Sequence, residues 1–461
     1  MTSTEKRASI GLAMIFACRM LGLFMILPVL SLFAGELKDA TPQLIGLAIG
    51  GYGFTQALLQ IPFGLLSDKI GRKTVITLGL LLFAAGSIVA AQADTIYMVI
   101  AGRVLQGSGA IAAAIMALAA DLTREEHRTK AMAMIGMSIG LAFAIAMVAG
   151  PAIGAQFGIK GLFWITAALA LLAIAVLFVI VPTPTVIRFH RDAEVQPARF
   201  GSVLAHPELL RLDFGILTLH MILTASFVVL PVILRDTLGI PTLKHSTIYL
   251  PVMVASVIAM IPLIILAEKK RRMKLVFLGA IFLIASAQGG LAYFHSQLMT
   301  VVACLWVFFT GFNLLEATLP SLISKIAPAD LKGTAMGVYS SSQFFGAFLG
   351  GSVGGWLTGK YGPQAVFLFC AAIAVFWWLI AVWMKPPKPV SSLLIHIGNM
   401  DSTQARFLAG ELRKTPGVLE AVVVADEGVA YLKIDRQRLD RDRIQAIIES
   451  VTQPEPQLAE T

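Results

Sequence analysis

The sequence has little charge. Asp, Glu, Lys and Arg make up 14% of its 461 residues, whereas 57% of the residues are hydrophobic. A soluble protein of this size needs a far more charged surface, so we expect the lipid bilayer to be its environment. Cysteine is scarce as well: Cys18, Cys304 and Cys370 all lie in apolar segments and form no C-x-x-C pair. This spacing argues against disulfides and against a metal site.

Nucleotide-binding signatures are absent too. The sequence contains no Walker A motif and no aspartyl-phosphate motif, so ATP-driven pumping is not expected. We therefore expect neither an enzyme nor a bound cofactor. The formal net charge is +9, but the positive residues gather in short loops between apolar segments, so no nucleic-acid partner is needed to explain it.

The sequence is instead dominated by long apolar runs. A run of about 20 residues crosses a bilayer as a helix with a rise of about 1.5 Å per residue. We expect an all-α membrane bundle of twelve such helices, at 10–33, 44–66, 74–93, 96–119, 131–155, 162–181, 212–234, 247–267, 275–295, 299–324, 334–358 and 365–384.

Positive charge is unevenly distributed between the two sides of these spans. One side carries 21 Lys and Arg, and the other carries five, namely Lys38, Lys160, Arg235, Lys244 and Lys360. The richer side is expected in the cytoplasm. Both termini of this multi-pass chain are therefore predicted to be cytoplasmic.

The chain also repeats itself. The hexapeptide at 24–29 (FMILPV) matches the one at 227–232 (FVVLPV), and Gly107 and Gly150 match Gly311 and Gly354 at almost the same offset. A near-constant offset predicts two pseudo-symmetric six-helix halves. We place them at 1–182 and 211–385, with a cytoplasmic linker at 183–210 that is either a solvated connector or a helix lying on the membrane.

A small soluble domain follows the last span. A proline-rich linker at 386–391 breaks the helix, and strands are expected at 393–397, 418–425 and 429–434, with helices at 403–414 and 441–450. The order β-α-β-β-α predicts a ferredoxin-like α+β domain at 392–451. We expect residues 452–461 to be disordered.

One short loop carries the most specific pattern. Gly64, Asp68, Gly71, Arg72 and Lys73 lie between the second and third spans, in the order typical of one family. The loop resembles the signature loop of the major facilitator superfamily. Two further sets resemble motifs of that family: Arg103, Gln106, Gly107 and Gly109 in the fourth span, and, for its drug/proton antiporters, Gly150, Pro151 and Gly154 in the fifth.

The loop is also expected to act as a conformational latch. Asp68 carries a carboxylate that suits the N-terminus of a neighbouring helix, and the resemblance implies that this helix is the eleventh span, near Thr334. Arg72 has a candidate partner in Asp121, at the inner end of the fourth span. The resemblance implies that these contacts lock the halves in an outward-open state. The alternative is an ordinary loop that only sets orientation.

Four ionisable residues are expected inside the membrane, namely Arg19, Arg103, His220 and Glu316. Each is energetically costly there unless its charge is satisfied. Glu316 is the best candidate for a proton carrier; alternatively it forms a static pair with Arg19 or a hydrogen bond with Asn313. His220 titrates near neutral pH but also fits a satisfied core histidine. For Arg103 the resemblance implies a role in proton transfer, and structural pairing is the alternative.

Two further groups complete the predicted pathway. Polar residues suited to a central cavity are Tyr52, Gln56, Gln60, Tyr339, Ser342 and Gln343. Small residues on the fifth and eleventh spans, including Gly140, Gly150, Gly154, Gly346 and Gly354, are expected to let helices pack closely across the interface between the halves.

The family resemblance implies a secondary transporter of the bacterial inner membrane that works by alternating access, coupled to protons and exporting a small molecule. Uptake by symport stays open, as does a membrane receptor whose tail domain signals. The tail domain resembles heavy-metal-associated domains at Thr415-Pro416-Gly417-Val418, but lacks their cysteines. We expect it to bind a regulatory ligand or to mediate self-association.

Overall fold

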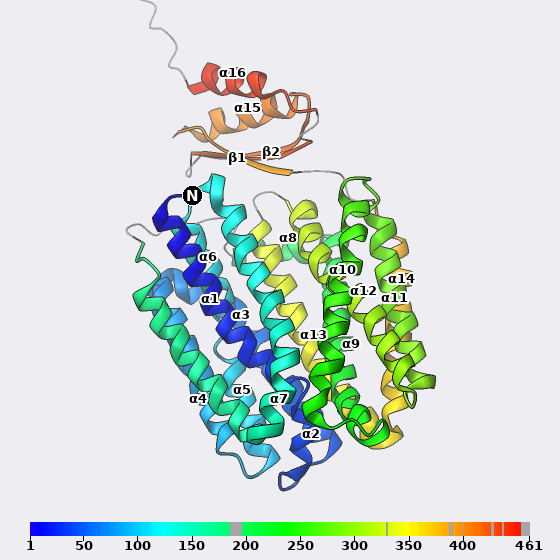
Figure 1. Ribbon diagram of the computed structural model, residues 1–461. Coiled ribbons are helices and arrows are strands. Elements are labelled where there is room, and N and C mark those ends of the chain that lie inside the picture. The colour runs from blue at the N-terminus through cyan, green and yellow to red at the C-terminus, as the bar shows by residue number, and fades with distance from the viewer. Residues whose placement is uncertain are drawn as a thin grey trace, which may run out of the picture.

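The computed structural model describes residues 1–184, 196–328, 331–386, 391–398, 400–425, 428–435 and 438–452. It shows a bundle of long helices with a small α+β domain over one end (Figure 1). We call that end, which also carries the N-terminus, the near end of the bundle, and the opposite end the far end. Residues 185–195 of the predicted linker, residues 387–390 of the proline-rich stretch and the tail from 453 lie outside the described residues.

The N-terminal half is built from seven helices and one short 3₁₀ turn. They are α1 (Ser3–Ile26), α2 (Leu30–Phe33), η1 (Ala34–Glu36), α3 (Pro42–Ile70), α4 (Arg72–Ala91), α5 (Ile96–Gly107), α6 (Ala112–Leu122) and α7 (Glu125–Val179). The long α7 contains Gly158 at φ 64°, a non-helical conformation that divides it into two spans.

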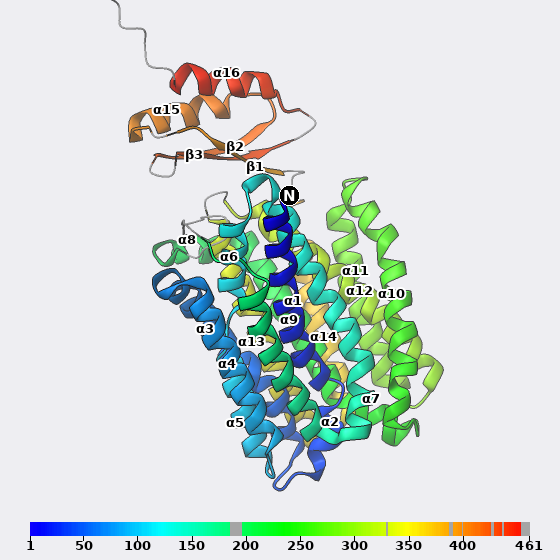
Figure 2. The same cartoon turned by 60° about the vertical axis from the view of Figure 1, so that its left-hand side comes forward.

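The C-terminal half follows a short helical segment. Its elements are η2 (Pro197–Arg199), α8 (Phe200–Leu204), α9 (Pro207–Val232), η3 (Ile233–Thr237), η4 (Thr242–Lys244), α10 (His245–Glu268), α11 (Met273–Phe294), α12 (Leu298–Ile326), α13 (Lys332–Tyr361) and α14 (Pro363–Val382). The short α8 lies beside the bundle at the near end (Figure 2).

Ten of the described helical segments are long and apolar enough to cross a membrane. One of them, Lys130–Val179, contains both the fifth and the sixth predicted spans, which the break at Gly158 separates. The eleventh predicted span is α13, which lies inside the bundle but is rich in glycine and serine and therefore less apolar. Each of the twelve predicted spans thus falls on a described helix or helix pair.

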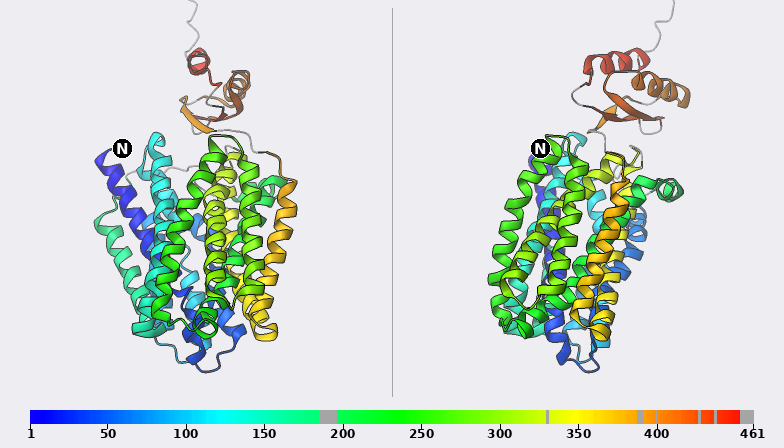
Figure 3. Two further views of the ribbon diagram at one scale, coloured as in Figure 1. Left: turned by 45° about the vertical axis from the view of Figure 1, so that its right-hand side comes forward. Right: turned by 90° about the vertical axis from the view of Figure 1, so that its right-hand side faces the viewer.

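The two halves stand side by side, as Figure 3 shows from two further directions. The matched hexapeptides lie where the first long helix of each half ends. Pro28 separates α1 from α2, and Pro231 precedes the π-turn η3 at the end of α9. Proline has no amide hydrogen for the helix ladder, so both halves interrupt the first span at the same level.

The C-terminal domain follows the predicted order. It comprises β1 (Ser391–His396), α15 (Ser402–Arg413), β2 (Val418–Val424), β3 (Val429–Ile434) and α16 (Arg441–Thr452). The antiparallel sheet has the strand order β1-β3-β2. The sheet faces the bundle, and α15 and α16 cover its outer side (Figure 2). Leu408, Leu412 and Leu432 are fully buried in between, which confirms the expected ferredoxin-like layers.

Candidate functional site: a near-end clasp and two polar clusters in the bundle

The signature loop forms a clasp at the near end. Gly71 adopts φ 98°, which lets the chain turn from α3 into α4. Arg72 is then buried, and its Nε donates to Asp121 Oδ2 at 3.2 Å. The same guanidinium contacts the Asp68 carboxylate and donates to Ser67 Oγ at 2.9 Å. The predicted contact between Arg72 and Asp121 is confirmed.

Two other residues of the loop support this clasp. Lys73 Nζ donates to the carbonyl oxygen of Val181 at 2.7 Å, which ties the start of α4 to the end of α7. A Cβ on Gly64 would come within 3.0 Å of Ala113, so this glycine lets α3 approach α6. Within the described residues, Asp68 contacts Arg72 rather than the start of α13.

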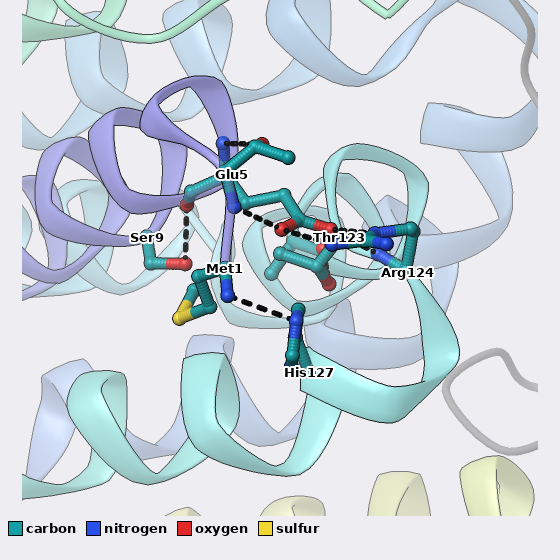
Figure 4. Close-up of polar contacts among 8 residues, drawn as sticks. Met1, Glu5, Ser9, Thr123, Arg124 and His127 are labelled. Carbon is teal, nitrogen blue, oxygen red and sulfur yellow. Dashed lines mark hydrogen bonds and ion pairs between the residues drawn. The ribbon is translucent and has the colours of Figure 1, made fainter.

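A second clasp, which was not singled out from the sequence, joins the start of α1 to the turn between α6 and α7 (Figure 4). Glu5 is buried, and its Oε1 accepts from Arg124 Nε at 2.9 Å and from the Arg124 amide at 3.1 Å. The Met1 amino group contacts His127 Nε2 at 2.8 Å. The start of α1 is thereby fixed to the turn between α6 and α7. No sequence pattern signals this pair, because the two residues are far apart in the chain.

Glycine contacts join the two halves toward the far end. A Cβ on Gly46 of α3 would lie 2.2 Å from the carbonyl oxygen of Gly351, and one on Gly355 would lie 2.5 Å from that of Pro42. The helix backbones therefore touch directly, as expected for small residues. On its other face α13 meets α9 of its own half, where Gly346 and Gly350 lie against further backbone atoms.

The glycines of the fifth span differ from the prediction. Gly150 lies against the carbonyl of Met25, and Gly154 lies against Val29, so both serve packing on the first span of the same half. No atom lies within 4 Å of a Cβ built on Gly140. Pro151 lies inside the same helix. These residues pack within the half because they face α1, a direction that sequence spacing alone does not determine.

The two described hydrogen bonds between the halves also lie at the far end. Arg235 Nη1 donates to the carbonyl of Leu32 at 2.8 Å, and Ser31 Oγ donates to the carbonyl of Phe227 at 3.4 Å. Closer to the near end, the ring centroids of Tyr52 and Phe344, which belong to opposite halves, lie 6.0 Å apart. In this conformation the bundle is closed at its far end.

The N-terminal half contains one polar cluster. Arg19 is fully buried and donates to Gln56 Oε1 at 2.7 Å and to the carbonyl of Gly109 at 2.9 Å. Gln56 in turn donates to Gln60 Oε1 at 2.7 Å. Arg19 therefore has no contact with Glu316 among the described residues, and the predicted static pair is not formed.

The second buried arginine, Arg103, belongs to the same region. Its guanidinium donates to the carbonyls of Ala48 and Ile49 and, at 2.9 Å, to Gln106 Oε1. The Tyr52 ring lies between both arginines, 5.8 Å from the Arg19 carbon Cζ and 5.2 Å from that of Arg103. A cation over an aromatic face is favourable, so this cluster holds two positive charges without a carboxylate.

The C-terminal half contains the second cluster, which is built around a carboxylate. Gln343 Nε2 donates to Glu316 Oε1 at 3.3 Å and lies 2.8 Å from His220 Nε2. Glu316 Oε2 lies 3.8 Å from His220 Nε2. The Glu316 side chain is 36% exposed, whereas the His220 side chain is 12% exposed. Asn313 instead donates to Ser256 at 3.0 Å, so the predicted bond to Glu316 is replaced by His220 and Gln343.

A family model described as "Major Facilitator Superfamily" matches residues 12–351 and 323–425. The chain belongs to the major facilitator superfamily. It is 49% identical to "Inner membrane transport protein YajR" of Escherichia coli (strain K12), with 97% of this chain and 98% of that protein covered. It is a membrane transporter.

Two more distant similarities agree with this family. "Multidrug resistance protein 2" of Bacillus subtilis (strain 168) is 26% identical, with 81% of this chain and 94% of that protein covered. A crystal structure of a bacterial homologue of the human lysosomal transporter Spinster, in an inward-facing and unoccupied conformation, matches with TM-score 0.65 at 14% identity. It covers 84% of this chain and 99% of that chain, and shows the shared fold.

Proposed function

We propose that this transporter couples the export of a small molecule to the entry of protons. The near end of the bundle lies on the cytoplasmic side of the bacterial inner membrane. The observation that carries the proton coupling is the cluster of Glu316, His220 and Gln343. It places a partly exposed carboxylate inside the bundle, in reach of a histidine and an amide but of no described arginine or lysine. Such a carboxylate can take up and release a proton as the halves move.

The orientation rests on charge. The loops and flanks at the near end hold the positive side of the 21-to-five asymmetry, and such residues favour the cytoplasm. With the near end inside, closure of the far end corresponds to an inward-facing arrangement. Alternating access then consists of the halves rocking about the substrate site, which we place near the midplane between them.

The latch role of the signature loop fits this arrangement. Here Asp68 contacts Arg72 within its own half, so it is available to exchange this partner for the N-terminus of α13 when the near end closes. Arg72 and Asp121 stay paired and hold the loop in position. The latch therefore stabilises the outward-open state and not the state described here.

Export is favoured over uptake by two observations. Gly150, Pro151 and Gly154 match the antiporter motif, and a relative is named a multidrug resistance protein. The match to that motif is incomplete, because alanine stands at 146 and 155, where the motif has glycine. We assign the C-terminal domain a regulatory or self-associating role at the cytoplasmic face.

The test is a flux measurement with a defined substrate. Compounds that raise the unfolding temperature of the purified protein are tested in reconstituted vesicles with an imposed pH gradient. Gradient-driven flux is expected for wild type. Glu316→Gln should abolish it while exchange between the two sides continues, and Glu411→Gln on the exposed face of α15 is the matched control. Ligand binding without any flux would indicate a receptor, and full coupling in Glu316→Gln would exclude this residue as the proton site.

A further inference from the structure

A second carboxylate of the C-terminal half has none of the partners that a charge requires. Asp213 lies two turns into α9, and the residue is 6% exposed. Both of its carboxylate oxygens are covered, and neither has a hydrogen-bond partner among the described residues. Asp213 was not among the residues expected inside the membrane, because it stands at the expected boundary of the seventh span.

Among the described residues, no Lys, Arg or His pairs with Asp213. On its own helix, Arg211 contacts Glu208 and donates to the carbonyl of Trp383, so its charge is used elsewhere. From α13 comes Tyr339, which is 3% exposed and whose hydroxyl has no described partner. The segments α8 and α14, which also pack on α9, contain no Asp, Glu, Lys, Arg or His.

Tyr339 connects this residue with the cluster deeper in the bundle. Its covered hydroxyl has no described hydrogen-bond partner, and its helix, α13, packs against α9, which carries Asp213. One turn further along α13 is Gln343, the residue that contacts Glu316 and His220. On α9, His220 follows Asp213 at a spacing of seven, which puts the two on the same face of the helix. Asp213 of α9 and Glu316 of α12 thus lie at two levels along α13, the helix that carries Tyr339 and Gln343.

We propose that Asp213 is a second proton-binding site, occupied by a proton in the far-end-closed conformation, and that Tyr339 relays this proton to and from Glu316. A buried ionised carboxylate without water or hydrogen bonds is so costly that the group takes a proton instead. The Tyr339 hydroxyl has no described partner in this conformation, so the relay requires it to form a hydrogen bond with each carboxylate in turn as the halves move. Tyr339 then gives its hydroxyl proton to the Asp213 carboxylate and receives one from protonated Glu316. One O–H bond forms and one breaks at each transfer, and no other reactant is consumed.

Occupancy of this site is independent of the proposed transport cycle, whereas its use in coupling rests on the function proposed above. The Glu316 side chain is 36% exposed, although its Oε2 is covered, whereas both carboxylate oxygens of Asp213 are covered. The pair would then act in series, with Glu316 as the point of exchange and Asp213 as the store. Asp213 therefore extends the proton pathway toward the near end.

The test is infrared spectroscopy of the full-length protein in lipid at neutral pH. A protonated aspartic acid gives a carbonyl stretching band distinct from that of a carboxylate. In wild type grown with carbonyl-labelled ¹³C-aspartate, this band is expected to shift to lower frequency. Asp213→Asn should abolish it. The matched control is Asp94→Asn, because the hydrogen bond from Lys160 holds the pKa of Asp94 below its ordinary value and keeps that exposed group ionised.

The relay has a separate readout. On transfer to D₂O the Asp213 acid band shifts as its proton exchanges, and Tyr339→Phe or Glu316→Gln should slow this shift severalfold while leaving the band itself in place. If wild type shows no acid band that shifts with the ¹³C-aspartate label, the proposed site is overturned, whatever the flux experiment shows. A band that remains in Asp213→Asn would assign the proton to another residue, and unchanged exchange in Tyr339→Phe would remove the relay.

Discussion

Gly46 of α3 and Gly351 of α13 touch backbone to backbone across the interface between the halves. A Cβ on Gly46 would lie 2.2 Å from the Gly351 carbonyl oxygen, and one on Gly351 would lie 2.5 Å from the Gly46 carbonyl oxygen. Neither helix can carry a side chain here while the far end is closed. In the proposed alternating-access cycle, this contact is released when the halves separate at that end.

Gly46→Ala should accordingly open the far end. The added methyl group overpacks the closed conformation by about 1–3 kcal/mol, whereas the far-end-open conformation has room for it. The measurement is the distance between spin labels at Lys38→Cys and Lys244→Cys, in a background without the three native cysteines. Gly140→Ala, whose Cβ meets no atom within 4 Å, is the control and should leave the distance unchanged. An unaltered distance in Gly46→Ala would show that the contact is not specific to closure.

Arg72→Ala should strongly destabilise the N-terminal half. The Arg72 and Asp121 side chains are 2% and 1% exposed, and removal of one partner of such a buried pair costs about 3–5 kcal/mol because the other charge is stranded. A lower midpoint in denaturant unfolding of the purified protein is expected. Lys160→Ala removes an exposed pair with Asp94 and should show no measurable change. Equal midpoints for the two variants would contradict the buried clasp.

Asp68→Asn should favour the inward-facing conformation. The neutral amide loses its attraction to the positive end of α13 in the opposite state, whereas Arg72 keeps Asp121 as a partner in the state described here. Labels at Lys69→Cys and Lys269→Cys, on opposite halves of the near end, should show a larger population at long distance. Asp94→Asn serves as the comparison. A shift toward short distances would mean that Asp68 stabilises the other state.

Lys433→Ala should loosen the C-terminal domain from the bundle. Lys433 Nζ donates to the carbonyl of Ile326, at the end of α12, at 3.2 Å and pairs with Glu420 at 3.1 Å. A cation at a helix C-terminus contributes about 0.3–1 kcal/mol. Faster hydrogen exchange is expected in the last turn of α12. Lys414→Ala, which alters only a surface pair with Glu411, should not affect that turn, and identical exchange in both variants would count against docking through Lys433.

The sequence was most informative where charged residues stand at the ends of apolar runs. Arg72 and Asp121 could be paired from the sequence alone, because both lie at the same end of neighbouring spans and each needs a partner. The chain repeat likewise predicted the two halves, since Pro28 and Pro231 end equivalent helices for the same chemical reason.

Helix rotation is what the sequence could not supply. The alternatives to a proton-carrying Glu316 paired it with Arg19 or Asn313, whereas it meets His220 and Gln343 from other helices. Gly150 and Gly154 face α1 rather than the opposite half. A uniformly apolar membrane helix has no polar face to reveal its rotation, so only tertiary contacts determine which neighbours its polar residues meet.

The glycines on both faces of α13 also bear on the thermodynamics of switching. Gly346 and Gly350 contact α9, and Gly351 and Gly355 contact α3, in each case through backbone atoms. Glycine has no rotamers to order, so making or breaking these contacts changes little side-chain entropy. The change in side-chain entropy at this interface therefore contributes little to the free-energy difference between the conformations. Small energies, such as that of one proton or one bound substrate, are sufficient to decide it.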